Sequence, residues 1–380
     1  MKSSQHYPER VTHDRPSQRS VPGKTGHVPF DIALEMHQMK HAPTLFVMAF
    51  SAIVGMARAA DWQALPGQPP IPADNPQTPA KIELGKILFN DPRLSSTGTV
   101  SCASCHSVME GGDDHRPVSM GVHGQAGGRN APTVWNAAYH SAQFWDGRAA
   151  TLEDQAKGPV TNPVEMGMPD LASAVGRLKA IPGYAPLFAK AFGQGDTITV
   201  DNMARAIAAY ERTLVTPNSP YDRYVKGDHK ALSARQVRGM NAFAATGCTA
   251  CHSGAAFDGP AMPAGQPFLA RFPTFTDTPY VAQYKLDVDQ GRYASTAIES
   301  DRHMWRVPTL RNLIYTAPYF HNGSVKTIPE AVKVMASTQL NKQLDDATAT
   351  DIAAFLEALT GEFPTQTMPR LPATPGNLIE

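Results

Sequence analysis

All four cysteines of this 380-residue chain fall in two short motifs, each of which ends in a histidine. The two motifs read Cys102-Ala-Ser-Cys105-His106 and Cys248-Thr-Ala-Cys251-His252. Two thiols at this spacing can add to the two vinyl groups of one haem, and the adjoining histidine can then bind the iron. Zinc is the alternative that the same side chains allow. Two complete motifs with no cysteine left over favour two covalent c-type haems, with His106 and His252 as proximal ligands.

An export signal precedes the first motif at some distance. A basic start at Met39 is followed by an apolar run over residues 45–56 and by Ala57-Arg58-Ala59, which is typical of a signal-peptidase site. This pattern predicts cleavage after Ala59 and a mature protein in the periplasm, where c-type haems are attached. An uncleaved membrane anchor is the alternative.

Composition and length limit the remaining possibilities. Lys plus Arg and Asp plus Glu both number 34, so the zero net charge argues against a nucleic-acid partner. The mature chain is long enough for two domains, and one haem motif lies in each half. We expect a leader and signal peptide over 1–59, an N-terminal cytochrome c-type domain over 60–217 and a C-terminal cytochrome c-type domain over 218–380.

The periodicity of apolar residues predicts a mainly α fold of two cytochrome c-type haem domains with long irregular loops. Met203 and Ile207 recur at helical spacing after Asp201, which we expect to be an N-cap. Thr327 is expected to open a helix through a capping box, and residues 351–359 predict another helix. No sustained alternation of apolar and polar residues indicates a sheet.

The sixth iron ligands decide whether haems of this kind transfer electrons or perform chemistry. His123 lies between glycine-containing turns after the first motif and could reach the first iron, and His115 is the alternative ligand. From spacing alone, either histidine could equally be an exposed loop residue.

Over nearly the whole mature chain, the sequence resembles the bacterial di-haem cytochrome c peroxidases, which also include the MauG-like enzymes. Several stretches carry the resemblance in the same order as in the family. They are Asp91-Pro92-Arg93-Leu94-Ser95, Arg129-Asn130-Ala131-Pro132-Thr133, Phe144-Trp145-Asp146-Gly147-Arg148, Glu165-Met166-Gly167, Val307-Pro308-Thr309-Leu310-Arg311-Asn312 and Thr316-Ala317-Pro318-Tyr319-Phe320-His321.

The resemblance implies a role for individual residues in each half. In the first half it makes His106 the proximal ligand of the peroxidatic haem, His123 a displaceable distal ligand and Glu165 an acid–base residue. The other implied residues are Gln155 in the peroxide pocket, Trp145 between the haems, His252 and Met335 as axial ligands of the second haem, and Asn130, Thr316 and Pro318 around a calcium ion. The chain departs from the family at Val122, which adds one residue to the loop before His123.

Physical chemistry supports several of these roles. Splitting peroxide requires a proton to move between its two oxygens, which a carboxylate such as Glu165 can do, while Gln155 can hold the oxygens. An indole such as that of Trp145 can couple two macrocycles, although aromatic residues more often belong to the core. A thioether ligand raises the potential of a haem, so Met335 favours the peroxidase branch over the quinone-forming branch, which has tyrosine near this point.

The resemblance implies a cytochrome-c peroxidase that reduces hydrogen peroxide with electrons from a small cytochrome c or cupredoxin. MauG-like oxidation of a partner protein and a non-catalytic di-haem electron carrier are the alternatives. A homodimer is compatible with the sequence.

Overall fold

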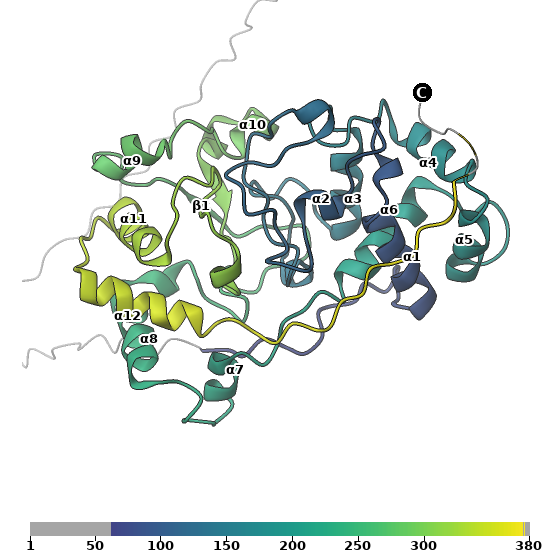
Figure 1. The fold of residues 1–380 in the computed structure, drawn as a ribbon. Coiled ribbons are helices and arrows are strands. Elements are labelled where there is room, and N and C mark those ends of the chain that lie inside the picture. Colours follow the sequence, from purple (N-terminus) through teal and green to yellow (C-terminus); the bar gives the residue numbers. More distant parts are fainter. Residues whose placement is uncertain (1–61, 375, 377–380) are drawn as a thin grey trace, which may run out of the picture. The chain divides into compact units, whose positions relative to one another are not determined.

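The computed structural model describes residues 62–374 and 376 (Figure 1). The predicted leader, 1–59, and its cleavage site after Ala59 lie outside the described residues. The fold is mainly helical, as predicted. The helices of the first half are α1 (Pro79–Phe89), α2 (Cys102–Cys105), α3 (Leu152–Thr161), α4 (Leu171–Lys179), α5 (Tyr184–Phe192) and α6 (Val200–Glu211). Those of the second half are α7 (Pro220–Val225), α8 (Ala234–Thr246), α9 (Pro279–Tyr284), α10 (Tyr293–Thr296), α11 (Ile328–Leu340) and α12 (Asp346–Glu357).

One small sheet was not expected from the sequence. Strands β1 (Leu269–Arg271) and β2 (Met304–Arg306) pair antiparallel, with Ala270 opposite Trp305. Each strand is only three residues long, too short for an alternating pattern to be visible in the sequence. Within the described part of the chain, no helix has the length and apolar character needed to cross a membrane.

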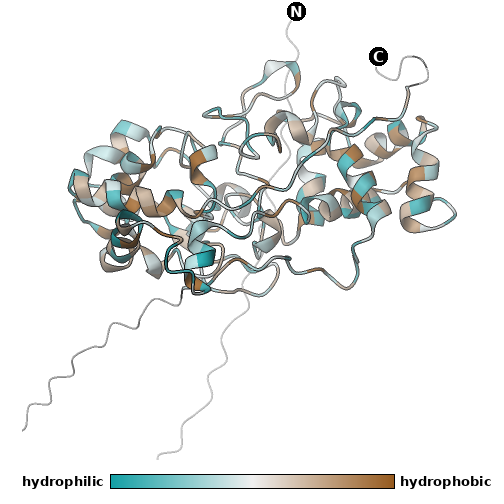
Figure 2. Ribbon diagram, turned by 60° about the horizontal axis from the view of Figure 1, so that its bottom comes forward, coloured by the Kyte–Doolittle hydropathy of each residue, from teal (hydrophilic) through white to brown (hydrophobic). Residues whose placement is uncertain are grey.

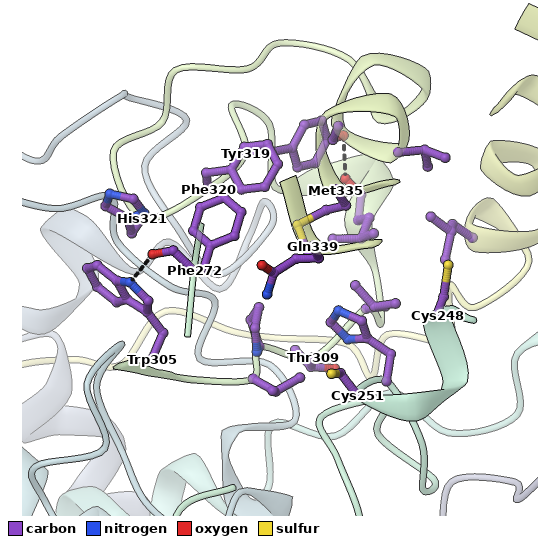
Figure 3. Close-up of a pocket in the computed structure, with 18 of the residues that line it drawn as sticks. Cys248, Cys251, Phe272, Trp305, Thr309, Tyr319, Phe320, His321, Met335 and Gln339 are labelled. Atoms are coloured by element: carbon purple, nitrogen blue, oxygen red, sulfur yellow. Dashed lines mark hydrogen bonds between the residues drawn. The ribbon is translucent and has the colours of Figure 1, made fainter. Parts of the chain in front are cut away.

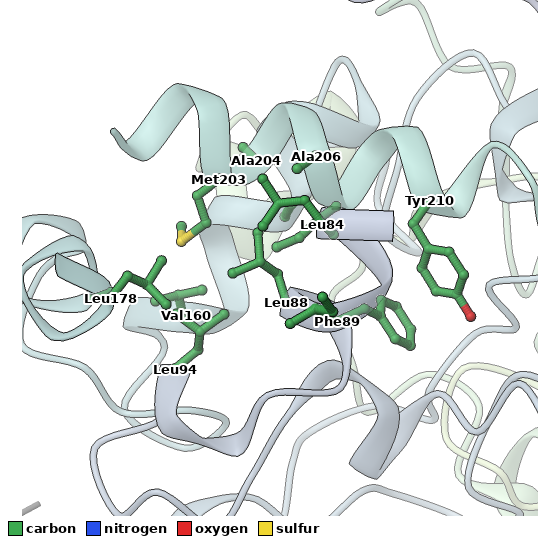
Figure 4. Packing of buried hydrophobic residues seen from close by; sticks show 14 of the residues in the cluster. Leu84, Leu88, Phe89, Leu94, Val160, Leu178, Met203, Ala204, Ala206 and Tyr210 are labelled. Carbon is green, nitrogen blue, oxygen red and sulfur yellow. The ribbon is translucent and has the colours of Figure 1, made fainter. Parts of the chain in front are cut away.

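The core of the first half forms where α1 crosses α6. Gly85 makes the crossing possible, because a Cβ atom there would lie 1.8 Å from the carbonyl oxygen of Ala206. Leu84 and Leu88 of α1 pack against Met203 of α6 in this cluster (Figure 4). Each of these side chains is fully buried and so contributes roughly 1.5–3 kcal/mol of transfer free energy.

In the second half, α8 and α12 cross in the same way, with a glycine at the contact. A Cβ atom at Gly239 of α8 would lie 1.8 Å from the carbonyl oxygen of Asp351 in α12. Phe243, Phe257 and Phe355 gather beside the crossing, with Phe243 and Phe355 5.5 Å apart between ring centroids. In both halves the helices carry apolar and polar residues on different faces, as Figure 2 shows.

Helix starts differ in detail from the predicted ones. The N-cap of α6 is Thr199, whose side chain accepts a hydrogen bond from the backbone of Asn202, so the prediction of Asp201 is wrong. Thr327 does cap α11, through a hydrogen bond from the backbone of Glu330. Helix α12 begins at Asp346 after the cap Asp345, five residues before the predicted start.

Each end of the described chain packs against the half that is farther away in the sequence. Near the N-terminus, Trp62 packs among the aromatic rings of the second cluster, and the backbone of Leu65 donates to Asp222. After α12, the C-terminal segment runs back to the first half (Figure 1), where Phe363 packs 4.8 Å from Trp135. Each half is therefore completed by a segment from the other end of the chain.

Candidate functional site

The first haem motif lines a cavity between α2, α3 and α6. Cys102 and Cys105 are the two ends of α2, and His106 follows as its C-cap. The Nδ1 atom of His106 lies 3.3 Å from the carbonyl oxygen of Gly112, which leaves Nε2 available to a metal. Burial lowers the pKa of His106, and the neutral imidazole is the form that binds iron.

The second motif lines a separate cavity beside α8 and α11 (Figure 3). His252 is buried, and its Nδ1 lies 2.9 Å from the carbonyl oxygen of Phe257, so Nε2 is again free for a metal. Met335 of α11 lies across this cavity from Cys251, with its sulfur directed inward. A histidine and a thioether thus face one cavity from two sides, a donor set that suits a haem iron.

The four cysteines fit thioether attachment better than any other use. All four are free thiols. Burial raises the pKa of Cys102 to about 12 and that of Cys248 to about 11, so neither is a ready thiolate ligand. Throughout residues 62–374, no three His, Cys, Asp or Glu side chains cluster as a metal site would require. The zinc alternative therefore finds no support.

Glu165 and Gln155 line the cavity of the first motif together. Gln155 projects from α3, and Glu165 lies in the turn that follows this helix. The amide of Asn162 donates to Glu165 Oε1 at 2.8 Å. Burial raises the pKa of Glu165, and Arg148 and Asn162 offset only part of this effect. A carboxyl with a raised pKa can hold and release a proton nearer to neutral pH.

Trp145 lines both cavities. Its indole Nε1 donates to the carbonyl oxygen of Asn130 at 2.8 Å, and its own carbonyl oxygen accepts from the backbone of Arg306. The ring is therefore fixed by two elements that are far apart in the sequence. Of the described aromatic residues, it is the one that borders both cavities.

Neither candidate distal histidine lines either of these two cavities. His123 is exposed in a left-handed conformation, with a φ of 58°, although its loop is fastened beside the site by a hydrogen bond from the backbone of Val122 to the carbonyl oxygen of Glu165. The side chain of His115 is 41% exposed and lies near Asp113. Binding of His123 to an iron would require its loop to rearrange.

The loop after the first motif meets the second half at Asn130. Asn130, Thr316 and Pro318 all border the second cavity, and the backbone of Asn130 donates to the carbonyl oxygen of His321. Asp113 is buried in the adjoining loop, and within the described residues neither of its carboxylate oxygens has a hydrogen-bond partner. Burial raises its pKa to about 6. Such oxygens suit a hard cation.

Glu211 is a cavity residue that sequence reasoning missed. It lies at the end of α6, lines the first cavity and is buried. Its Oε2 finds no hydrogen-bond partner among the residues described, and burial raises its pKa to about 8. Met203, Ile207 and Glu211 follow one another at intervals of four, so an acid on the apolar face was the available signal.

Replacing Glu211 with Gln is expected to stabilise the protein increasingly as pH rises. In the unfolded chain the carboxyl ionises near pH 4.5, whereas in the folded chain it stays protonated to about pH 8. The parent therefore loses stability as pH rises through this range, by up to about 5 kcal/mol at 1.36 kcal/mol per unit. Urea unfolding of the haem-loaded protein at pH 5 and pH 8 measures the difference.

The exposed Glu83 on α1 offers the matched control. Glu83→Gln should change the free energy of unfolding by the same small amount at both pH values. If Glu211→Gln behaves in the same way, the Glu211 carboxyl is ionised or solvated in the loaded protein.

Comparison with known proteins agrees with this architecture. The sequence pattern of the family described as "Di-haem cytochrome c peroxidase" matches residues 79–230. The chain is 44% identical to cytochrome c551 peroxidase of Pseudomonas aeruginosa, over 86% of this chain and 94% of that protein. It is 37% identical to the methylamine utilization protein MauG of Methylorubrum extorquens, over 81% of this chain and 86% of that protein.

Among solved structures, a MauG-like protein associated with microbial copper homeostasis is similar, with a TM-score of 0.67 and 29% identity. The match covers 80% of this chain and 95% of that one. Two cavities, each lined by one haem motif, agree with the two haems that the family description names. The chain belongs to the di-haem cytochrome c peroxidase family.

Proposed function

We propose that this protein is a periplasmic cytochrome-c peroxidase that reduces hydrogen peroxide to water. The reaction consumes one peroxide, two protons and two electrons and yields two waters. A small cytochrome c or a cupredoxin is the proposed electron donor. The observation that carries the proposal is the cavity in which the first haem motif, Glu165 and Gln155 face one another.

Glu165 is the proposed acid–base residue. When bound in the first cavity, haem supplies the iron at which the O–O bond is reduced. Glu165 takes the proton from one peroxide oxygen and returns it to the other, which leaves as water. Gln155 holds the peroxide oxygens from α3. The raised pKa of Glu165 supports this role, because the group must both accept and donate at working pH.

Electrons are proposed to enter at the haem of the second half and to pass Trp145 on the way to the haem of the first half. His252 and Met335 are the proposed axial ligands of the second haem, and the thioether keeps its potential high enough to accept electrons from the donor. Trp145 lines both cavities, which supports its proposed role between the haems. The domains 60–217 and 218–380 carry one haem each. The buried members of the two main apolar clusters support this division, because those of one run from Leu84 to Leu214 and those of the other from Tyr221 to Leu359.

His123 is the proposed gate of the first iron. Replacing it with Gly is expected to let the fully oxidised protein bind cyanide, because the proposed distal ligand is gone. The oxidised parent should bind cyanide much more slowly than the variant. Absorption spectra of the oxidised proteins after addition of cyanide measure both rates.

His115→Gly is the matched control, because His115 is the other histidine of the same region and lies beside Asp113 instead of in the loop fastened to Glu165. It should bind cyanide as slowly as the parent. Rapid binding by the oxidised parent would mean that His123 does not gate the iron, and the longer loop containing Val122 would be the physical reason.

Asn130, Thr316 and Pro318 are proposed to hold a calcium ion between the two halves. The buried carboxylate of Asp113 in the adjoining loop, which accepts no hydrogen bond in the described chain and has His115 nearby at 3.6 Å, supports a nearby cation. Calcium accepts carbonyl and amide oxygens at several positions, so the proposed ligands match its chemistry.

Export, cleavage after Ala59 and assembly as a homodimer complete the proposal. Mass spectrometry of the purified protein should give the mass of a chain that begins at Ala60 plus two haems, and the mass of the native assembly should correspond to two chains. A full-length, haem-loaded product in the cytoplasm would contradict the assignment to the periplasm.

The activity is tested by following oxidation of a reduced small cytochrome c and of a reduced cupredoxin after peroxide is added. Two donor molecules should be oxidised for each peroxide. A variant with both Cys102 and Cys105 changed to Ala, which cannot attach the first haem, should show no turnover. Donor oxidation that does not depend on peroxide would instead indicate an electron carrier.

A further inference from the structure

Four arginines line the two cavities in the described part of the chain, and one of them differs from the rest. Arg129 and Arg148 both form ion pairs with Asp146, and Arg311 forms a fully buried pair with Asp222 at 2.8 Å. Arg306 has no carboxylate within ion-pair distance among residues 62–374. Of the four, it is the one that forms no direct ion pair in the described chain.

Arg306 is nevertheless deeply buried. It is 6% exposed and is the last residue of β2, a strand that lines the second cavity. Its Nε donates to the carbonyl oxygen of Phe144 at 3.1 Å, and Nη1 donates to the carbonyl oxygen of Val307 at 3.3 Å. No described residue accepts from Nη2. Its direct hydrogen bonds go only to neutral carbonyl groups, and the carboxylates of Asp258 and Asp146 act on its charge from beyond ion-pair distance. A buried guanidinium without a direct anionic partner is costly unless an anion binds it.

A buried histidine borders the same cavity. His140 has a side chain that is only 4% exposed, and its Nδ1 lies 2.6 Å from Asp258 Oδ2. This contact fixes the ring and leaves Nε2 without a hydrogen-bond partner in the described chain. His140 and Arg306 line the same cavity, and burial together with the Arg306 charge lowers the pKa of His140.

We infer that Arg306, with His140 beside it, binds one of the carboxylates of the haem attached at Cys248 and Cys251. A haem carries two carboxylate side chains at the edge opposite its vinyl groups, and an apolar cavity must provide charge for them. The open Nη2 of Arg306 donates to the carboxylate, a charge-assisted hydrogen bond. Nε2 of His140 is the adjacent group that can share a proton with it. The inference rests on the proposal that this cavity holds a haem.

The first test is Arg306→Gln, with the reduction of each haem followed separately by spectroelectrochemistry. Loss of a positive charge near the second haem favours its oxidised iron. Its reduction equilibrium constant should fall at least tenfold, which is about 59 mV for one electron. The first haem should keep its potential. Arg238→Gln on the surface of α8, where the arginine is 62% exposed, is the matched control and should change neither haem.

The haem content of the parent is measured first. A parent with a single haem would refute the proposed function, whereas two haems with an unchanged second potential in Arg306→Gln would overturn only the inference. If Arg306→Gln does not fold, Arg306→Lys is used, because it keeps the charge and loses the planar fork. Resonance Raman should then show shifted carboxylate bending modes of the second haem, and unshifted modes would overturn the inference.

Discussion

Glu165→Gln is expected to lower peroxide turnover by roughly a hundredfold or more, the scale on which proton transfer by a positioned side chain contributes. Glutamine has nearly the same shape and can still accept the hydrogen bond from Asn162, so the cavity should keep its form. It cannot accept and return a proton. Steady-state turnover with a reduced donor, measured over a range of pH, reports the loss.

Two controls separate a proton-transfer defect from damage to the fold. Haem content and both reduction potentials should stay close to those of the parent. Glu110→Gln, at a glutamate whose side chain is 58% exposed just after the first motif, should turn over normally. Near-parental turnover in Glu165→Gln would mean that a different group moves the proton, and the buried Glu211 in the same cavity would be the next candidate.

The haem motifs could be predicted from the sequence because their chemistry is local. Two thioether bonds and an adjoining ligand require fixed spacing within five residues, and the structure indeed places each motif on the wall of one cavity. The helical character was predicted for a similar reason, since apolar periodicity and capping residues act within one or two turns. Even so, the cap of α6 is Thr199 and not Asp201, because both residues can accept from the backbone and only the folded chain selects one.

The rest of the candidate site depends on contacts between distant segments. Glu165 and Gln155 meet the first motif only after α3 packs against α6, and no spacing rule predicts that arrangement. Their roles were proposed from family resemblance alone. The crossing of the chain ends could not be predicted either, since Trp62 and Phe363 each complete a cluster formed by the other half.

Arg306 shows why some functional residues have no sequence signal. It stands in a three-residue strand, and an arginine at a strand end is usually exposed. Only the folded chain shows that this one is buried without a carboxylate partner. Glu211 differs, because its place on an apolar helix face was visible and could have been read as a buried acid.

Met335→His is expected to lower the potential of the second haem by on the order of 0.1–0.3 V, within the range that axial ligands span. Imidazole is a stronger donor than a thioether and stabilises the oxidised iron. The near-infrared absorption band of histidine–methionine ligation, expected in the oxidised parent, should disappear. Electron delivery from the donor should slow, while the first haem keeps its own spectrum.

Met368→His is the matched control, because that methionine is 68% exposed and lies outside both cavities. It should leave both potentials unchanged. The comparison also decides between the two branches of the family, because a hard ligand such as tyrosine suits oxidation of a partner protein, whereas a thioether suits uptake of electrons from a soluble donor. An unchanged second potential in Met335→His would remove Met335 as a ligand, and the MauG-like alternative would then account better for the site.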